Sequence, residues 1–240
     1  MAGYDRRRHP PMSANISVPA CTAILVAAGS SRRMGMDKLA WPLAGVPVLR
    51  RTLDAFLAAD SIAAIVVVCP EERWRLLGGP EFPKPVTRVD GGVNRQDSVA
   101  NGLAAIIPSS RYVAVHDGAR PLIAPQDIDR CVAAAIEHRA ATLASRVTET
   151  MQRSDAEDFS TEPVNREHLW RMETPQVFET ALLWEACAVL SVRGVVLTDE
   201  VTAVQLCGTR VKFIESRHAN LKITTPADLA LAEALLSIKP

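Results

Sequence analysis

The chain has 240 residues, 48% hydrophobic and 22% charged, a composition typical of a globular protein with a substantial core. Its 27 basic residues balance its 27 acidic ones, so no net charge would draw it to nucleic acid or to a membrane surface. No apolar stretch is long enough to span a membrane and residues 1–20 lack the apolar segment of a signal peptide, so we predict a cytoplasmic protein without either partner.

The five cysteines, Cys21, Cys69, Cys131, Cys187 and Cys207, lie far apart and form no C-x-x-C pair. They predict buried thiols in a reducing compartment rather than a disulfide framework or a zinc site. The five histidines show no metal-ligand spacing either.

Residues 1–20 are polar and contain prolines, which predicts a flexible N-terminal extension before a single domain over residues 21–240. Apolar strand-like runs then alternate with helical periodicity, which predicts an α/β fold with a mostly parallel sheet flanked by helices. The predicted strands are Ala23–Ala28, Ala63–Cys69, Val86–Asp90, Tyr112–His116, Thr142–Ser145 and Val211–Ile214. The predicted helices are Val48–Ala59, Gln96–Ile107, Pro125–Arg139, Ala181–Leu190, Asp199–Cys207 and Pro226–Ser237.

The segment from Arg146 to Pro163 interrupts this alternation because it is rich in threonine, serine and charge. It is expected to project from the body of the protein. The residues alone favour a surface loop over an extension that reaches a neighbouring subunit.

The first predicted strand leads into a turn of small residues with three cations, in AILVAAGSSRRMGMDK, residues 23–38. Gly29 can adopt backbone angles closed to other residues, and the serines after it let backbone amides approach an anion. Arg32, Arg33 and Lys38 add charge suited to phosphate oxygens. The segment predicts a phosphate site, with a solvated basic turn as the alternative, and its spacing fits no dinucleotide, P-loop or kinase glycine motif.

In an open α/β sheet ligands bind beyond the carboxyl ends of the strands, where the third predicted strand is followed by GGVNRQDS, residues 91–98. The two glycines permit close backbone approach to a flat ligand. Arg95 and Ser98 begin a helix whose dipole favours an anion or a base carbonyl. The segment predicts a nucleobase site, with a plain glycine turn capped by Asn94 as the alternative.

The fourth predicted strand is followed by DGARP, residues 117–121. A carboxylate at this strand tip, Asp117, could hold Mg²⁺ against triphosphate oxygens, because Mg²⁺ prefers oxygen ligands. The alternative is a structural pair of Asp117 with Arg120. His116 is interpreted as a packed, hydrogen-bonded strand-end histidine rather than a general base.

Further along the chain, hydroxyl and cationic groups lie beside predicted turns, as would suit a phosphorylated small molecule: Thr150, Arg166, Thr174 and Lys222. Each alone also fits an ordinary surface residue. The triplet Thr198-Asp199-Glu200 is interpreted as the N-cap and first-turn acids of a helix.

These segments, with ETPQVF, TDE and NLKITTPADL, resemble in order and spacing the cytidylyltransferases of the 2-C-methyl-D-erythritol 4-phosphate pathway, from about Thr22 to Ser237. The resemblance implies a Rossmann-like fold. It implies transfer of the cytidylyl group of CTP to 2-C-methyl-D-erythritol 4-phosphate, with release of pyrophosphate and with Mg²⁺ as cofactor. It also implies a homodimer in which residues 146–170 form an exchanged β-arm, in place of the surface loop.

The resemblance also implies roles for individual residues. The catalytic cations would be Arg33, Lys38 and Lys222. The nucleotide contacts would be Ala27, Ala28, Gly29, Gly92, Arg95, Ser98 and Gly118. The acceptor contacts would be Asp117, Thr150, Arg166, Thr174 and Lys222, with Asp117 also near the metal and with Thr150 and Arg166 supplied by the partner subunit.

The chain departs from the family pattern at a few positions, since the spacer between Arg33 and Lys38 is short and Ser31, Val93 and Gly118 replace residues frequent there. Two other functions stay open at this stage. One is the same chemistry on another polyol phosphate such as ribitol 5-phosphate, and the other is a non-catalytic nucleotide-binding module.

Overall fold

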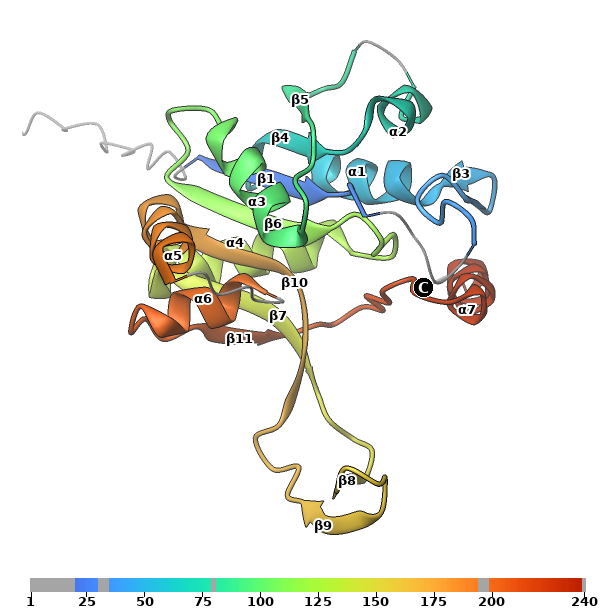
Figure 1. The fold of residues 1–240 in the computed structure, drawn as a ribbon. Coiled ribbons are helices and arrows are strands. Elements are labelled where there is room, and N and C mark those ends of the chain that lie inside the picture. Colours follow the sequence, from blue (N-terminus) through green and yellow to red (C-terminus); the bar gives the residue numbers. More distant parts are fainter. Residues whose placement is uncertain (1–19, 30–34, 79–80, 194–198, 239–240) are drawn as a thin grey trace, which may run out of the picture.

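The computed structural model describes residues 20–29, 35–78, 81–193 and 199–238, so the predicted N-terminal extension lies almost wholly outside the described residues. A seven-stranded sheet in the order β11-β7-β10-β6-β1-β4-β5 forms the centre of the molecule (Figure 1). The strands are β1 (Cys21–Val26), β4 (Ile62–Val68), β5 (Val86–Val89), β6 (Tyr112–Asp117), β7 (Ala140–Arg146), β10 (Trp170–Glu179) and β11 (Lys212–Glu215). All neighbouring pairs are parallel except the two made by β10, which confirms the predicted mostly parallel sheet.

The strand predicted least well is β10, which no predicted strand covered. Its sequence WRMETPQVFE mixes charged and apolar residues and shows neither an apolar run nor a regular alternation. It nevertheless lies between β6 and β7 and buries Glu173, Thr174 and Gln176 inside the sheet. These buried polar side chains lie next to the end of β6.

Seven helices accompany the sheet in the described part of the chain: α1 (Val48–Ala58), α2 (Glu71–Leu76), α3 (Arg95–Ala104), α4 (Pro125–His138), α5 (Thr180–Arg193), α6 (Glu200–Leu206) and α7 (Pro226–Ser237). All six predicted helices are present. The unpredicted one, α2, has only six residues, too few to show a helical period.

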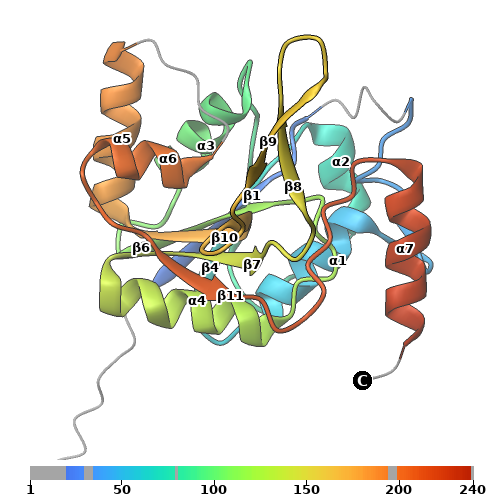
Figure 2. The ribbon, with the colours of Figure 1, turned by 90° about the horizontal axis from the view of Figure 1, so that it is seen from below.

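Two apolar clusters cover the two faces of the sheet. Helices α1 and α4 pack on the face that includes Ala23 and Leu25, whereas α3, α5 and α6 lie on the other side of the sheet (Figure 2), on the face that includes Ile24. Successive residues of β1 therefore enter opposite clusters, as the twofold period of a strand requires. Burial on both sides explains why the parallel strands were recognisable as continuous apolar runs.

Between β7 and β10 the chain forms an antiparallel hairpin of β8 (Met151–Ser154) and β9 (Ser160–Val164), which projects away from the sheet (Figure 1). The projection confirms the expectation for this segment, while its exchange with a partner stays a prediction. A second small hairpin, β2 (Pro42–Leu43) with β3 (Val46–Pro47), follows the first loop.

The five cysteines are free thiols, of which Cys21, Cys69 and Cys131 are buried, as predicted, and Cys187 and Cys207 are partly buried. Among the described residues, no helix has the length and apolar character needed to cross a bilayer.

Candidate active site

The carboxyl ends of β1, β5 and β6 bring three loops together, as predicted. Val26 and Asp117 are register partners in the β1–β6 pair, and the amide of Gly118 donates to the Val26 carbonyl at 2.9 Å. A side chain at Gly91 would place its Cβ only 2.2 Å from the Cβ of Ala28. The loops at these strand ends therefore meet at a distance that only glycine allows.

Gly118 is a second position where the loops pack closely. A Cβ there would lie 2.9 Å from Leu49 Cδ1, 3.1 Å from Ala27 Cβ and 3.2 Å from the Val26 carbonyl oxygen. The backbone of the β6 turn can thus lie directly against the end of β1, among the residues predicted to contact the nucleotide.

Asp117 lies at the centre of the site and is shared by three cations. Its carboxylate is 2.9 Å from Lys222 Nζ, 3.4 Å from Arg120 Nε and 3.5 Å from Arg95 Nε. Burial alone would raise the pKa of Asp117, but Lys222, Arg95 and Arg120 together hold that pKa well below its usual range. The carboxylate stays ionised, and the Asp117–Arg120 pair considered from the sequence is part of a larger cluster.

Glu200 is a site residue that the sequence reasoning missed. It stands in the first turn of α6, as predicted, but its carboxylate is buried and accepts from Arg95 Nη1 at 2.5 Å. The N-cap of α6 is Asp199, one residue later than predicted, and the amides of Glu200 and Val201 donate to Gln176 Oε1. Burial raises the pKa of Glu200 while Arg95 opposes that rise. No local pattern could reveal a partner 105 residues away.

The segment that carries Lys222 is fixed to the turn after β6. Arg120 Nη1 donates to the Asn220 carbonyl at 2.8 Å, and the amide of Ile223 donates to the Ala119 carbonyl at 2.9 Å. Asn220 Nδ2 donates in turn to the Thr174 carbonyl at 2.8 Å. These bonds hold Lys222 against Asp117.

Lys38, in the first loop, is bonded to the segment that carries Lys222. Its Nζ donates to the carbonyl of Ile223 at 2.7 Å, one residue beyond Lys222. The structure therefore brings two of the three predicted catalytic cations together. The third, Arg33, lies outside the described residues.

Thr174 and His116 lie beneath Asp117. The hydroxyl of Thr174 accepts from the Asp117 amide at 3.2 Å and lies 2.9 Å from His116 Nδ1. His116 is fully buried, with its ring 4.8 Å from that of Phe56, and burial lowers its pKa to about 3. The imidazole is neutral at physiological pH, which confirms the packed histidine, and the Thr174 hydroxyl supports the strand end.

The nucleobase segment is organised by its own hydrogen bonds. The amide of Gly92 donates to Ser98 Oγ at 3.0 Å, and Ser98 Oγ donates to the Asn94 carbonyl at 3.0 Å. Asn94 caps α3 in a capping box with Asp97, so the cap considered in the alternative interpretation of this segment is present, and the box with Asp97 was not predicted. Arg95 and Ser98 thus lie at a fixed helix start beside Asp117.

Two predicted acceptor residues lie apart from this cluster. Thr150 and Arg166 are exposed, and the Arg166 guanidinium donates to the Thr148 carbonyl. Both residues belong to the segment between β7 and β10, which projects from the sheet (Figure 1). Within one chain, the structure does not bring them to Asp117.

The donor set fits a metal ion that arrives with a nucleotide. Across the described ranges, no group of three or more His, Cys, Asp or Glu side chains could hold a metal ion by itself. Mg²⁺ commonly uses one or two carboxylates with substrate phosphates and water, and ionised Asp117 supplies one such carboxylate.

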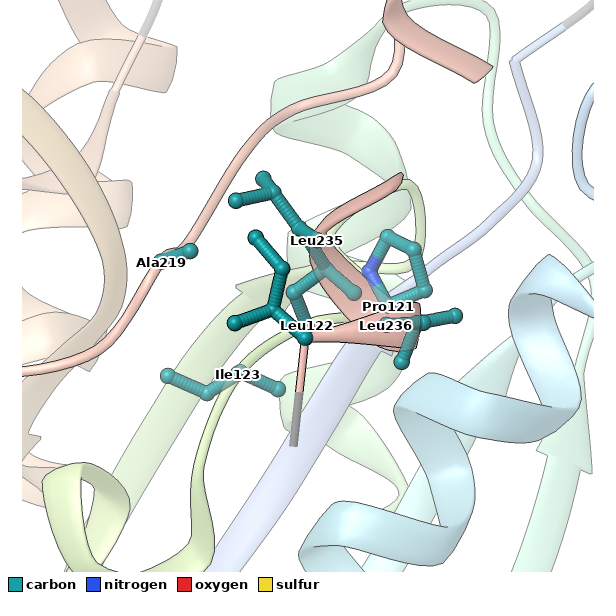
Figure 3. Close-up of a pocket in the computed structure, with 7 residues that line it drawn as sticks. Pro121, Leu122, Ile123, Ala219, Leu235 and Leu236 are labelled. Carbon is teal, nitrogen blue, oxygen red and sulfur yellow. The ribbon is translucent and has the colours of Figure 1, made fainter. Parts of the chain in front are cut away.

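An apolar hollow of about 340 Å³ lies beyond the β6 turn, between this turn and α7 (Figure 3). It is lined by Pro121, Leu122, Ile123, Ala219, Leu235, Leu236 and Ile238. Because these side chains are apolar, the hollow does not suit an anionic substrate, and the cation cluster is the better candidate for the chemistry.

Cations gathered at glycine-lined strand ends of an open α/β sheet can bind a nucleotide and neutralise phosphate charge, which is the task of a nucleotidyltransferase. The family model described as 2-C-methyl-D-erythritol 4-phosphate cytidylyltransferase matches residues 21–238. The chain belongs to this family and is therefore a nucleotidyltransferase, which confirms the resemblance seen in its motifs.

Relatives with the same description support this assignment. The chain is 39% identical to the 2-C-methyl-D-erythritol 4-phosphate cytidylyltransferase of Prochlorococcus marinus (strain MIT 9313), over 90% of this chain and 98% of the relative. It is 35% identical to the chloroplastic enzyme of Oryza sativa subsp. japonica, over 91% of this chain and 75% of the relative. The crystal structure of the Thermus thermophilus enzyme matches with a TM-score of 0.75 at 33% identity, covering 90% of this chain and 98% of that one.

Proposed function

We propose that this chain transfers the cytidylyl group of CTP to 2-C-methyl-D-erythritol 4-phosphate, giving 4-diphosphocytidyl-2-C-methyl-D-erythritol and pyrophosphate. The single observation that carries this proposal is the pairing of Lys222 and Arg95 with Asp117, with Lys38 bonded to the Ile223 carbonyl next to Lys222, in a chain of this family.

The reaction needs charge neutralisation more than proton transfer. A phosphate monoester has a second pKa near 6, so at neutral pH the acceptor phosphate is mostly a dianion and can attack without a base. One of its oxygens forms a bond to the α-phosphorus of CTP as the bond from that phosphorus to the bridging oxygen breaks, and pyrophosphate leaves. Arg33, Lys38 and Lys222 would stabilise the charge that develops.

CTP would bind to residues at the carboxyl ends of the strands. We assign the triphosphate to Ala27, Ala28 and Gly29 with the loop cations, and the cytidine to Gly92, Arg95 and Ser98. Supporting this, Gly91 and Gly118 allow backbones to approach within contact distance, and Arg95 is held by Glu200 and Asp117 at the start of α3.

The acceptor half would combine both subunits of a homodimer. Asp117 and Lys222 come from one body, where the buried Thr174 hydroxyl supports the Asp117 amide, and the partner subunit's Thr150 and the partner subunit's Arg166 would contact the acceptor phosphate. The projection of the arm, with both side chains exposed, supports this assignment.

We further propose that Mg²⁺ binds with CTP, next to Asp117, and that the enzyme acts in the cytoplasm. When bound, the ion supplies positive charge to the triphosphate. The chain contributes an ionised carboxylate that the surrounding cations keep deprotonated.

The test is pyrophosphate release from CTP with purified protein, with 2-C-methyl-D-erythritol 4-phosphate and ribitol 5-phosphate as separate acceptors. We expect release with the methylerythritol phosphate and little with the ribitol phosphate. Release with neither would overturn the proposed activity, and preference for ribitol 5-phosphate would replace the acceptor.

A further inference from the structure

Arg73 is a buried arginine that joins two distant parts of the first loop. It comes from α2, the short helix after β4, and only 7% of the residue is exposed. Its Nη1 donates to the carbonyl of Ala27 at 2.5 Å, and its Nε donates to Asp37 Oδ2 at 2.7 Å. One guanidinium therefore binds both the end of β1 and the residue just before Lys38.

The Asp37 carboxylate extends this connection to the backbone around Lys38. Its other oxygen, Oδ1, accepts from the amide of Leu39 at 3.1 Å. Lys38 thus lies between two residues fixed by one carboxylate, and that carboxylate is fixed by Arg73. The Lys38 side chain then reaches the Ile223 carbonyl beside Lys222.

The position of Arg73 is itself set by the sheet. The amide of Arg73 donates to the Pro70 carbonyl at 3.1 Å, and the amide of Cys69 donates to the Val89 carbonyl at 3.0 Å. A planar guanidinium can hold a carbonyl and a carboxylate at once in fixed directions, which a lysine ammonium does less well.

We propose that Arg73 is a positioning residue for the transfer reaction, because it ties the end of β1 to Asp37 and so holds Lys38 where it can reach the triphosphate. This inference rests on the proposed function of Lys38. Without Arg73, the Ala27 carbonyl and the Asp37 carboxylate lose a common donor. Lys38 would then have to be ordered when CTP binds.

The experiment measures steady-state kinetics with both substrates and thermal unfolding for Arg73→Met, Arg73→Lys and Asp37→Asn. We expect Arg73→Met to lower kcat/KM for CTP about tenfold or more, since small displacements of a charge-stabilising group are costly. KM for the acceptor should stay unchanged, whereas general loosening of the fold would raise it too. Arg73→Lys should restore part of the loss.

The matched control is Arg75→Met, because Arg75 lies on the same helix with its side chain 72% exposed and forms an ion pair with the surface carboxylate of Glu71. It should leave the kinetics as in the wild type. In the double variant Arg73→Met with Asp37→Asn, the loss should not exceed that of Arg73→Met alone, because both changes break one connection.

Wild-type kcat/KM for CTP in folded Arg73→Met, with a large loss in Lys38→Ala, would overturn this inference and leave the proposed function intact. Unchanged turnover in both variants would reject the role of Lys38 itself. Should Arg73→Met fail to fold, Arg73→Lys and Asp37→Asn carry the test, and wild-type kinetics in both would overturn the inference.

Discussion

At the scale of single residues, the charged side chains of the site can be buried only because each one lies next to a side chain of opposite charge. Asp117 is 8% exposed, and it neutralises cations that come from α3, the β6 turn and the segment before α7. A buried charge left without its partner is strongly destabilising. Binding a triphosphate would replace or add partners for the same cations, which couples ligand binding to the stability of this region.

The lowered pKa of Asp117 predicts how stability depends on pH. Since the folded-state pKa lies below the unfolded value of about 3.9, the carboxylate stabilises the fold above that value and loses its contribution as pH falls below it. We expect Asp117→Asn to unfold more easily than the wild type by a constant margin between about pH 5 and pH 7. Below about pH 4 the margin should shrink.

Chemical denaturation of both proteins across this pH range measures the margin. A margin that grows as pH falls would contradict the predicted sign. The ion pair of Arg50 with Asp54, on the exposed side of α1, offers a control, because Asp54→Asn should have little effect on stability over the range.

Lys38 and Lys222 give the sharpest prediction for activity. Replacing either by alanine removes a cation from the site, and turnover should fall by about a hundredfold or more. The unfolding temperature should change little in Lys38→Ala but fall in Lys222→Ala, because buried Asp117 then loses its nearest cation. Lys212→Ala, an exposed lysine on β11, should leave turnover unchanged. Near-normal turnover in Lys38→Ala would reject its catalytic role.

At the scale of elements, the strands and helices that could be predicted are those with a local sequence signal. Parallel strands buried on both faces appear as apolar runs, and α3 and α7 begin at capping boxes that can be identified from a few residues. Strand β10 could not be predicted this way, because its polar residues are satisfied by partners distant in sequence.

Some site residues could likewise be predicted from the sequence and others could not. Asp117, Lys222 and Arg95 could be proposed because they follow predicted strands or match a family motif. Glu200 lies in the TDE segment but was predicted only as a first-turn acid, and Arg73 lies in a short helix that was not predicted. Both look ordinary until the fold brings their partners to them.

The cap of α3 predicts that a loss of helix stability also weakens nucleotide binding. Asn94 accepts from the Asp97 amide at 3.0 Å, so Asn94→Ala should cost about 1 kcal/mol of folding stability. Because Arg95 is the next residue, KM for CTP should rise with little change in KM for the acceptor.

Asp129→Ala is the control for this prediction. Asp129 binds the backbone and side chain of Ser61, at the amino end of β4 and thus at the opposite end of the strands from the site. It should lower stability and leave KM for CTP unchanged. An equal rise of KM in both variants would mean that stability, not the start of α3, determines the effect.

At the scale of the whole molecule, the arm formed by β8 and β9 projects away from the body of its own chain (Figure 1). An isolated two-stranded hairpin is marginally stable in water, and in this arm Met151 is 43% exposed and Phe159 67% exposed. A second copy of the chain that packed against the arm would cover these side chains and deliver Thr150 and Arg166 to a neighbouring site.

Arm exchange predicts that two inactive variants restore activity when mixed. In a mixed dimer of Lys222→Ala and Arg166→Ala, one site would combine the intact body of the second chain with the intact arm of the first. Random mixing of equal amounts makes about half of the dimers mixed, each with one working site, so activity should recover to about a quarter of the wild-type value. If each chain completed its own site, activity would not recover even after native mass spectrometry had shown that subunits exchange, because each chain would carry its own defect.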